Sequence, residues 1–139
     1  PGRQKRICVC HRQHLDERWR YQRGYETASI VFMSTLLRLC PVEHSHEGEP
    51  LRIEREGLPA LAIFRSGDRH FVTVDQCTHG QGILTEGTQE GTEIECPLHG
   101  GVFDLTTGEA IRFPCKLPLR TWEPQIVDGW ICIAHEPPA

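Results

Sequence analysis

Long hydrophobic runs, tyrosine and methionine are scarce in this sequence, which has two tyrosines and a single methionine, Met33, in 139 residues. No stretch approaches the roughly 18 consecutive apolar residues of a membrane-spanning helix. A chain of this length has room for one core, which excludes a multidomain enzyme. No nucleophile with an adjacent base and no carboxylate pair is recognisable, so we expect no catalysis by this chain alone.

The composition, with 38% hydrophobic and 24% charged residues, is that of a soluble globular domain. Seven cysteines, an odd number without a recognisable secretory signal, indicate a reducing compartment. In such a compartment cysteine serves as a metal ligand or as a small core residue rather than in disulfides. We therefore expect a cytoplasmic protein with no membrane partner.

Charge is unevenly distributed along the chain. Residues 1–32 contain seven of the 15 Lys and Arg residues and three of the 19 Asp and Glu residues, so their net charge is +4. Residues 33–139 contain the remaining eight basic and sixteen acidic residues, so their net charge is −8. Residues 18–23 interleave cations with aromatics, as some nucleic-acid contacts do, but the block is short and no binding fold surrounds it. We interpret residues 1–32 as a basic segment, disordered or upstream of the true start at Met33, and expect no nucleic-acid partner.

From Met33 onward, short apolar runs alternate with turn residues, and no helical period is evident. Asp128-Gly129 between two such runs is a strong two-residue hairpin signal, because a type I′ turn needs positive φ at both positions. The pattern predicts a small, all-β, antiparallel domain. The predicted strands are residues 36–39, 51–53, 60–64, 71–74, 93–95, 101–105, 119–122, 125–127 and 130–134.

Two short, similar stretches carry the chemistry. Cys77-Thr78-His79-Gly80 is followed, after sixteen intervening residues from His79, by Cys96-Pro97-Leu98-His99-Gly100. Two thiols and two imidazoles on two glycine-closed loops indicate a metal site, and one loop can give one Cys and one His to opposite sides of a dinuclear centre. A structural Cys₂His₂ zinc site is the alternative.

Other candidate ligands are weaker. Cys8, Cys10, His11 and His14 have ligand-like spacing, but they lie in the basic segment without predicted strands around them. We expect Cys40, Cys115 and Cys132 to be small buried apolar residues.

The two-loop motif resembles that of the Rieske [2Fe–2S] proteins, Cys-x-His followed by Cys-x-x-His, and the resemblance extends over residues 33–139. It implies a Rieske-type antiparallel β-sandwich or barrel with a cluster-binding subdomain at about residues 76–105. It also implies one [2Fe–2S] cluster, with Cys77 and Cys96 on the inner iron and His79 and His99 on the outer one.

Further residues are expected to surround this cluster. Gly80, Gly100 and Gly101 would let backbone N–H groups approach the sulfides without an intervening Cβ. Pro114, in the segment 113–118, would belong to the proline loop that covers the cluster in this family.

Departures from the family's high-potential branch predict a low reduction potential. That branch has a disulfide-forming cysteine in each loop, where this chain has Gly82 and Leu98. It also follows its second histidine with Gly-Ser-x-Tyr, whereas residues 100–103 are Gly-Gly-Val-Phe and lack both hydroxyl donors. Fewer hydrogen bonds to sulfur stabilise the reduced cluster less, so we expect a potential toward the lower end of the range of roughly −150 to +300 mV.

A free-standing Rieske domain of this size looks like the ferredoxin component of bacterial aromatic-ring-hydroxylating dioxygenase systems. The resemblance implies a monomeric electron carrier between an FAD-containing ferredoxin reductase, which oxidises NAD(P)H, and a terminal oxygenase. A regulatory or sensory iron–sulfur module, or a protein like the small subunit of nitrite reductase, is the alternative. The acidic balance suggests docking onto basic patches of partners.

Overall fold

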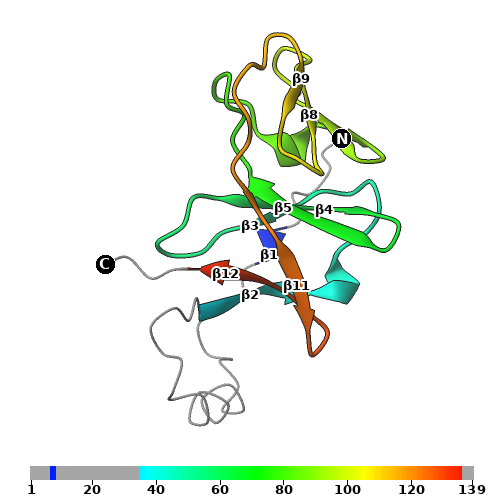
Figure 1. Cartoon of the computed structure of the whole chain (residues 1–139), viewed down its shortest axis with the longest axis vertical. Helices are drawn as coiled ribbons and strands as arrows, with labels where there is room; N and C mark the ends of the chain where they lie inside the picture. Colours follow the sequence, from blue (N-terminus) through cyan, green and yellow to red (C-terminus); the bar gives the residue numbers. More distant parts are fainter. Residues whose placement is uncertain (1–6, 9–34, 136–139) are drawn as a thin grey trace.

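The computed structural model describes residues 7–8 and 35–135, which form three β-sheets and two short 3₁₀ turns, η3 (Val42–His44) and η4 (Leu84–Glu86). The described part of the chain has no α-helix. Figure 1 shows the sheets one above another, with strands β8 and β9 at one end and β2, β11 and β12 toward the other. The predicted all-β class is confirmed.

Each sheet combines strands from separate parts of the chain. The first has the order β1-β3-β4-β5-β10, the second β11-β12-β2 and the third β6-β7-β8-β9. All pairings are antiparallel except β1 with β3. The strands are β1 (Ile7–Cys8), β2 (Thr35–Pro41), β3 (Leu51–Ile53), β4 (Leu61–Ser66), β5 (Arg69–Val74), β6 (Thr88–Glu90), β7 (Glu93–Glu95), β8 (Val102–Asp104), β9 (Ala110–Arg112), β10 (Thr121–Trp122), β11 (Pro124–Val127) and β12 (Trp130–His135).

Strand β4 is buried on both faces and separates two hydrophobic cores, where the length of the chain predicts one. Leu61 and Ile63 point into the first core, which β2, β3, β5 and β12 complete. Ala62 and Phe64, one residue out of phase, belong to a second core beside the small sheet. Because successive side chains of a strand point to opposite faces, this continuous apolar run is what a strand between two cores requires.

All nine predicted strands exist, with small differences at their ends. Three observed strands were not predicted: β1, β6 and β9. Strands β6 and β9 are short and mostly exposed, so their sequences lack the apolar alternation that marks a strand.

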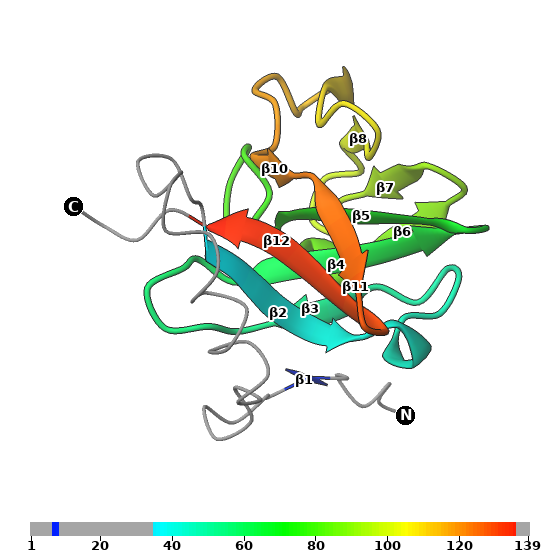
Figure 2. The same cartoon turned by 60° about the horizontal axis from the view of Figure 1, so that its bottom comes forward.

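The predicted hairpin turn joins β11 and β12, which lie along the front of the view in Figure 2. Asp128 and Gly129 have φ of 51° and 78°, the two positive values of a type I′ turn. The side chain of Asp128 accepts this conformation at little cost, since Asp tolerates the left-handed region better than most residues do.

Ile7 and Cys8 are the only described residues of the basic segment. They form β1 and pair with Arg52 and Ile53 at the edge of β3. The rest of residues 1–32, including the candidate ligands Cys10, His11 and His14, lies outside the described residues. No helix of the described part is long and apolar enough to cross a membrane.

We expect a chain that starts at Met33 to keep its cluster. Removing residues 1–32 deletes the two-residue pairing of β1, while β3 stays paired with β4 through Leu51–Ile53. Loss of about two backbone hydrogen bonds should cost roughly 1–3 kcal/mol of folding stability. Iron content and visible absorbance of the shortened chain test this, and loss of the cluster would show that residues 1–32 belong to the working domain.

Candidate metal centre

The four predicted ligands lie in two loops at the same end of the domain. The first loop, residues 75–83, follows β5 and ends at η4, and it carries Cys77 and His79. The second loop, residues 96–101, joins β7 to β8 and carries Cys96 and His99. Both loops therefore begin where an antiparallel strand ends, which fixes the position of each cysteine.

Backbone hydrogen bonds give both loops the same closed form. Cys77 N–H donates to the Gly82 carbonyl at 2.8 Å, and Cys96 N–H donates to the Gly101 carbonyl at 2.7 Å. Behind each cysteine a second bond tightens the turn, from Gly80 N–H to the Cys77 carbonyl and from Gly100 N–H to the Cys96 carbonyl. The repeated motif of the sequence thus corresponds to a repeated local structure.

The cysteines and the histidines face different surroundings. Cys77 and Cys96 are buried in the second core, together with Leu84, Ile94 and Phe103. His79 and His99 are exposed, and their rings meet edge to face with centroids 4.8 Å apart. The structure therefore brings two thiols together inside and two imidazoles together outside.

This arrangement fits a cluster of two metals better than one ion. Among residues 7–8 and 35–135, no group of three or more His, Cys, Asp and Glu side chains is placed to hold a metal ion. A Rieske cluster takes two cysteines on one iron and two histidines on the other, which matches the inner and outer pairs. Burial raises the pKa of the Cys96 thiol, so binding of a metal by this thiol would release a proton.

The proline segment 113–118, which the resemblance places over the cluster, lies against the first loop. The Thr78 hydroxyl donates to the Leu117 carbonyl at 2.8 Å. The Cys115 Sγ lies 3.5 Å from the Cys77 Sγ, and burial together with the contact to Cys77 raises the pKa of the Cys115 thiol to about 12. Pro114, half-buried, precedes Cys115 after a cis peptide bond with Phe113.

The glycines of the loops differ in what they require. Gly100 has φ of +72°, a conformation that favours glycine, while the Cβ of a residue at position 80 would meet nothing within 4 Å. At position 101, a Cβ would lie 2.2 Å from the Cys115 Sγ. Gly101 is therefore needed by the Cys115 side chain as well as by its predicted place beside the cluster.

All five cysteines of residues 35–135 are buried and free of disulfides. Cys40 and Cys132 belong to the interior as predicted, away from the ligand loops. The prediction that residues 40, 115 and 132 are small buried residues is thus confirmed for all three, and Cys115 differs only in touching a predicted ligand.

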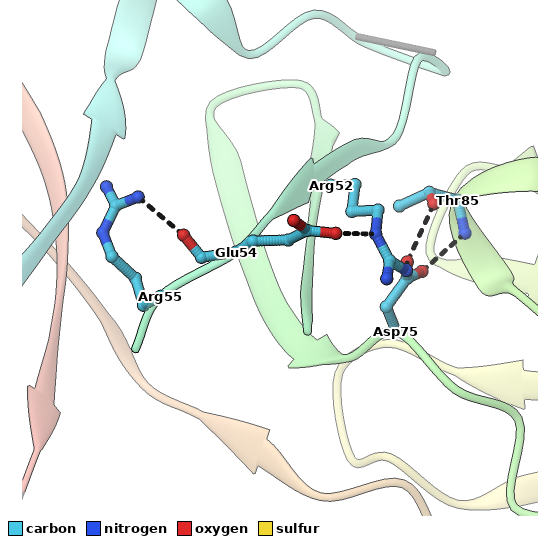
Figure 3. A network of polar contacts seen from close by, with 5 residues as sticks. All are labelled: Arg52, Glu54, Arg55, Asp75 and Thr85. Carbon is cyan, nitrogen blue, oxygen red and sulfur yellow. Dashed lines mark hydrogen bonds and ion pairs between the residues drawn. The ribbon is translucent and has the colours of Figure 1, made fainter. Parts of the chain in front are cut away.

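Sequence reasoning missed the buried carboxylate at the base of the first loop. Asp75 receives hydrogen bonds from the Thr85 N–H and hydroxyl and forms an ion pair with Arg52 (Figure 3). Its position, directly after a buried strand and two residues before Cys77, was a usable signal. Its partners could not be predicted, because Arg52 lies on another strand, 23 residues away.

Comparison with known proteins now identifies the class. The model of the Rieske [2Fe-2S] domain family matches residues 35–123, more than half of the chain, and this protein belongs to that family. Its cofactor is accordingly one Rieske-type [2Fe–2S] cluster.

Ferredoxins are among the similar proteins. Ferredoxin CarAc from Metapseudomonas resinovorans is 40% identical over 100 residues, which is 72% of this chain and 94% of that protein. The structure of a ferredoxin from Sphingomonas yanoikuyae B1 is 48% identical with a TM-score of 0.72, covering 73% of this chain and 100% of the other. A chain in the structure of the complex of reduced oxygenase and oxidized ferredoxin in carbazole 1,9a-dioxygenase is 37% identical, with a TM-score of 0.69. The match covers 77% of this chain and 99% of that chain.

Exchange of Gly101 for alanine should destabilise the centre through Cys115. The added methyl group would overlap the Cys115 Sγ, and overpacking of this kind typically costs about 1–3 kcal/mol. We expect faster loss of visible absorbance on heating for Gly101→Ala than for the unaltered protein.

The double variant Gly101→Ala/Cys115→Ala should recover part of this loss, because the sulfur that clashes is gone. Cys115→Ala alone is the control that completes the cycle. Purely additive effects of the two exchanges would contradict the proposed steric coupling.

Proposed function

We propose that this protein is the ferredoxin component of an aromatic-ring-hydroxylating dioxygenase system. In this role it takes single electrons from an FAD-containing reductase that oxidises NAD(P)H and delivers them to a terminal oxygenase. The main support is that a Rieske domain of ferredoxin length carries its two histidines at an exposed apolar end. Like the ferredoxins it resembles, it is not a catalyst alone.

When bound, the cluster supplies reversible one-electron chemistry at a Rieske potential. Cys77 and Cys96 would hold the inner iron away from water, and His79 and His99 would hold the outer iron at the surface. The exposed imidazole edges then lie where a docked partner can approach. The chain's own contribution is to exclude water on one side of the centre and to leave the other side accessible.

An apolar rim beside the histidines supports docking at this end. We define the rim as Leu98, Phe113 and Leu117, which are 55%, 76% and 66% exposed. Leu98 precedes His99 in the second loop, and Phe113 and Leu117 lie on the proline segment that contacts the first loop. Exposed apolar side chains gathered around a functional group mark an interaction surface more often than scattered ones do.

Charged side chains surround the rim without covering it. The Lys116 ammonium lies 5.7 Å from the centre of the Phe113 ring, and Arg112 pairs with Glu95 at 3.2 Å. Charge at the edge of an interface affects association rate and its dependence on salt more than affinity. The acidic balance of residues 33–139 would then act at longer range, steering the protein toward basic surfaces.

The alternative of a regulatory iron–sulfur module differs in its readout. A carrier sustains turnover of an oxygenase when the reductase and NAD(P)H are supplied, whereas a sensor changes partner affinity without sustaining turnover. The relatives named as ferredoxins favour the carrier. We further propose that the protein works as a cytoplasmic monomer.

The first test of the proposed function is a redox titration. Because the second loop lacks the serine and tyrosine hydroxyls of the high-potential branch, we expect a midpoint potential below about 0 mV. The reduced protein should also give a rhombic electron-paramagnetic signal. A midpoint well above that value would fit quinol oxidation instead and would contradict electron supply by a reductase.

The rim can be tested by its effect on electron transfer between proteins. Replacing Phe113 or Leu117 with serine removes apolar area that a docked partner would bury. Full burial of such a side chain contributes roughly 1.5–3 kcal/mol, and loss of half of that contribution to docking would slow electron transfer about threefold to tenfold. Stopped-flow mixing of the reduced protein with oxidised terminal oxygenase measures this rate.

The matched control is Ile126→Ser, because Ile126 is 52% exposed but lies on β11, away from the ligand loops. The midpoint potential should stay unchanged in all three variants. Equal slowing by the control would show that the rim has no special part in docking.

A further inference from the structure

The proposed function leaves one buried charged group unused. The Asp75 side chain is 0% exposed and lies two residues before the predicted ligand Cys77. An ionised carboxylate is costly to bury unless it is paired and hydrogen-bonded. Here the carboxylate accepts from the Thr85 N–H at 2.8 Å and from the Thr85 hydroxyl at 3.0 Å, and it pairs with the Arg52 guanidinium.

Asp75 and Thr85 stand at the two ends of the first ligand loop. Between them, Gln76 and Ile83 form a β-bridge and Cys77 N–H donates to Gly82. The backbone of Asp75 takes part as well, since Leu84 N–H donates to its carbonyl at 2.8 Å. The carboxylate therefore closes the loop that carries Cys77 and His79.

Arg52 connects this loop to the rest of the domain. It lies on β3, and its side chain is 25% exposed, so the guanidinium is partly in water while the carboxylate is not. Its Nε also donates to the Glu54 carboxylate at 3.0 Å, and Figure 3 shows the guanidinium between Glu54 and Asp75. Glu54 is 54% exposed, so its charge is screened by solvent. Of these three charged side chains, Asp75 and Arg52 are therefore the two whose charges solvent screens least.

We propose that the Arg52–Asp75 pair is a positioning element that holds the first ligand loop and also sets the local charge beside the cluster. Reduction adds one negative charge to the cluster. A buried carboxylate near a ligand therefore opposes reduction, and the guanidinium offsets it. The inference rests on the Rieske cluster and not on any partner protein.

Two single exchanges separate these roles because they change the local charge in opposite directions. Arg52→Gln leaves the carboxylate without its cation, so the midpoint potential should fall. At the potential where half of the unaltered protein is reduced, clearly less than half of this variant should be reduced. Asp75→Asn leaves the cation without its carboxylate, so the midpoint should rise. The double variant should return toward the unaltered value.

Arg52→Lys keeps the charge and loses the planar donor set, so it should keep the potential. Glu54→Gln is the matched control, because it removes the exposed partner of the same guanidinium and should leave the potential unchanged. Each variant is measured as the isolated full chain for iron content, electron-paramagnetic g-values and midpoint potential at one pH and ionic strength.

The outcomes distinguish the proposal from a purely structural role. Opposite shifts of Arg52→Gln and Asp75→Asn, in proteins with full iron content, support it. If Asp75→Asn binds no cluster, the closure of the loop is supported, and Arg52→Gln and Arg52→Lys still decide the charge. Unchanged potentials, or shifts in the same direction for both single variants, would overturn it. Failure of electron transfer to an oxygenase would bear on the proposed function alone, since no partner enters these measurements.

Discussion

Burial of both faces of β4 is the constraint on which the rest of the structure depends. Leu61 and Ile63 fix the first core, and Ala62 and Phe64 fix the second, so a single strand of six residues sets the distance between the two. Cys77 and Cys96 belong to the second core and are therefore positioned by the same packing that makes the domain stable. Of the four predicted ligands, the two cysteines are held by this packing, while the two histidines lie outside it.

The inner and outer halves of the centre are specified by different forces. Apolar burial holds the thiols, together with Phe103 and Cys115, and excludes water from them. Hydrogen bonds close the two loops that carry the exposed histidines, and the carboxylate of Asp75 lies at the base of the first loop. A small domain can serve electron transfer because the inner side of the centre needs only a core and the outer side needs only two turns.

Much of this was predictable from the sequence. Strands with apolar alternation, the Asp128-Gly129 turn and the Cys and His motif are local signals. The structure contains the strands and the turn, and it brings the two motif cysteines together in the core and the two motif histidines together at the surface. The short strands β6 and β9 could not be predicted, because pairing with β7 and β8 stabilises them rather than their own composition. The Arg52–Asp75 pair could not be predicted either, because it depends on which strands become neighbours in the folded chain.

The close approach of Gly101 to Cys115 has a consequence for the evolution of such domains. A side chain at position 101 and a sulfur at position 115 compete for the same space, with 2.2 Å between the added Cβ and the Sγ. Either position can drift only when the other allows it, so substitutions at the two sites should be correlated among descendants of a common ancestor. The proline segment and the second ligand loop, although separate in the chain, would then change together during evolution.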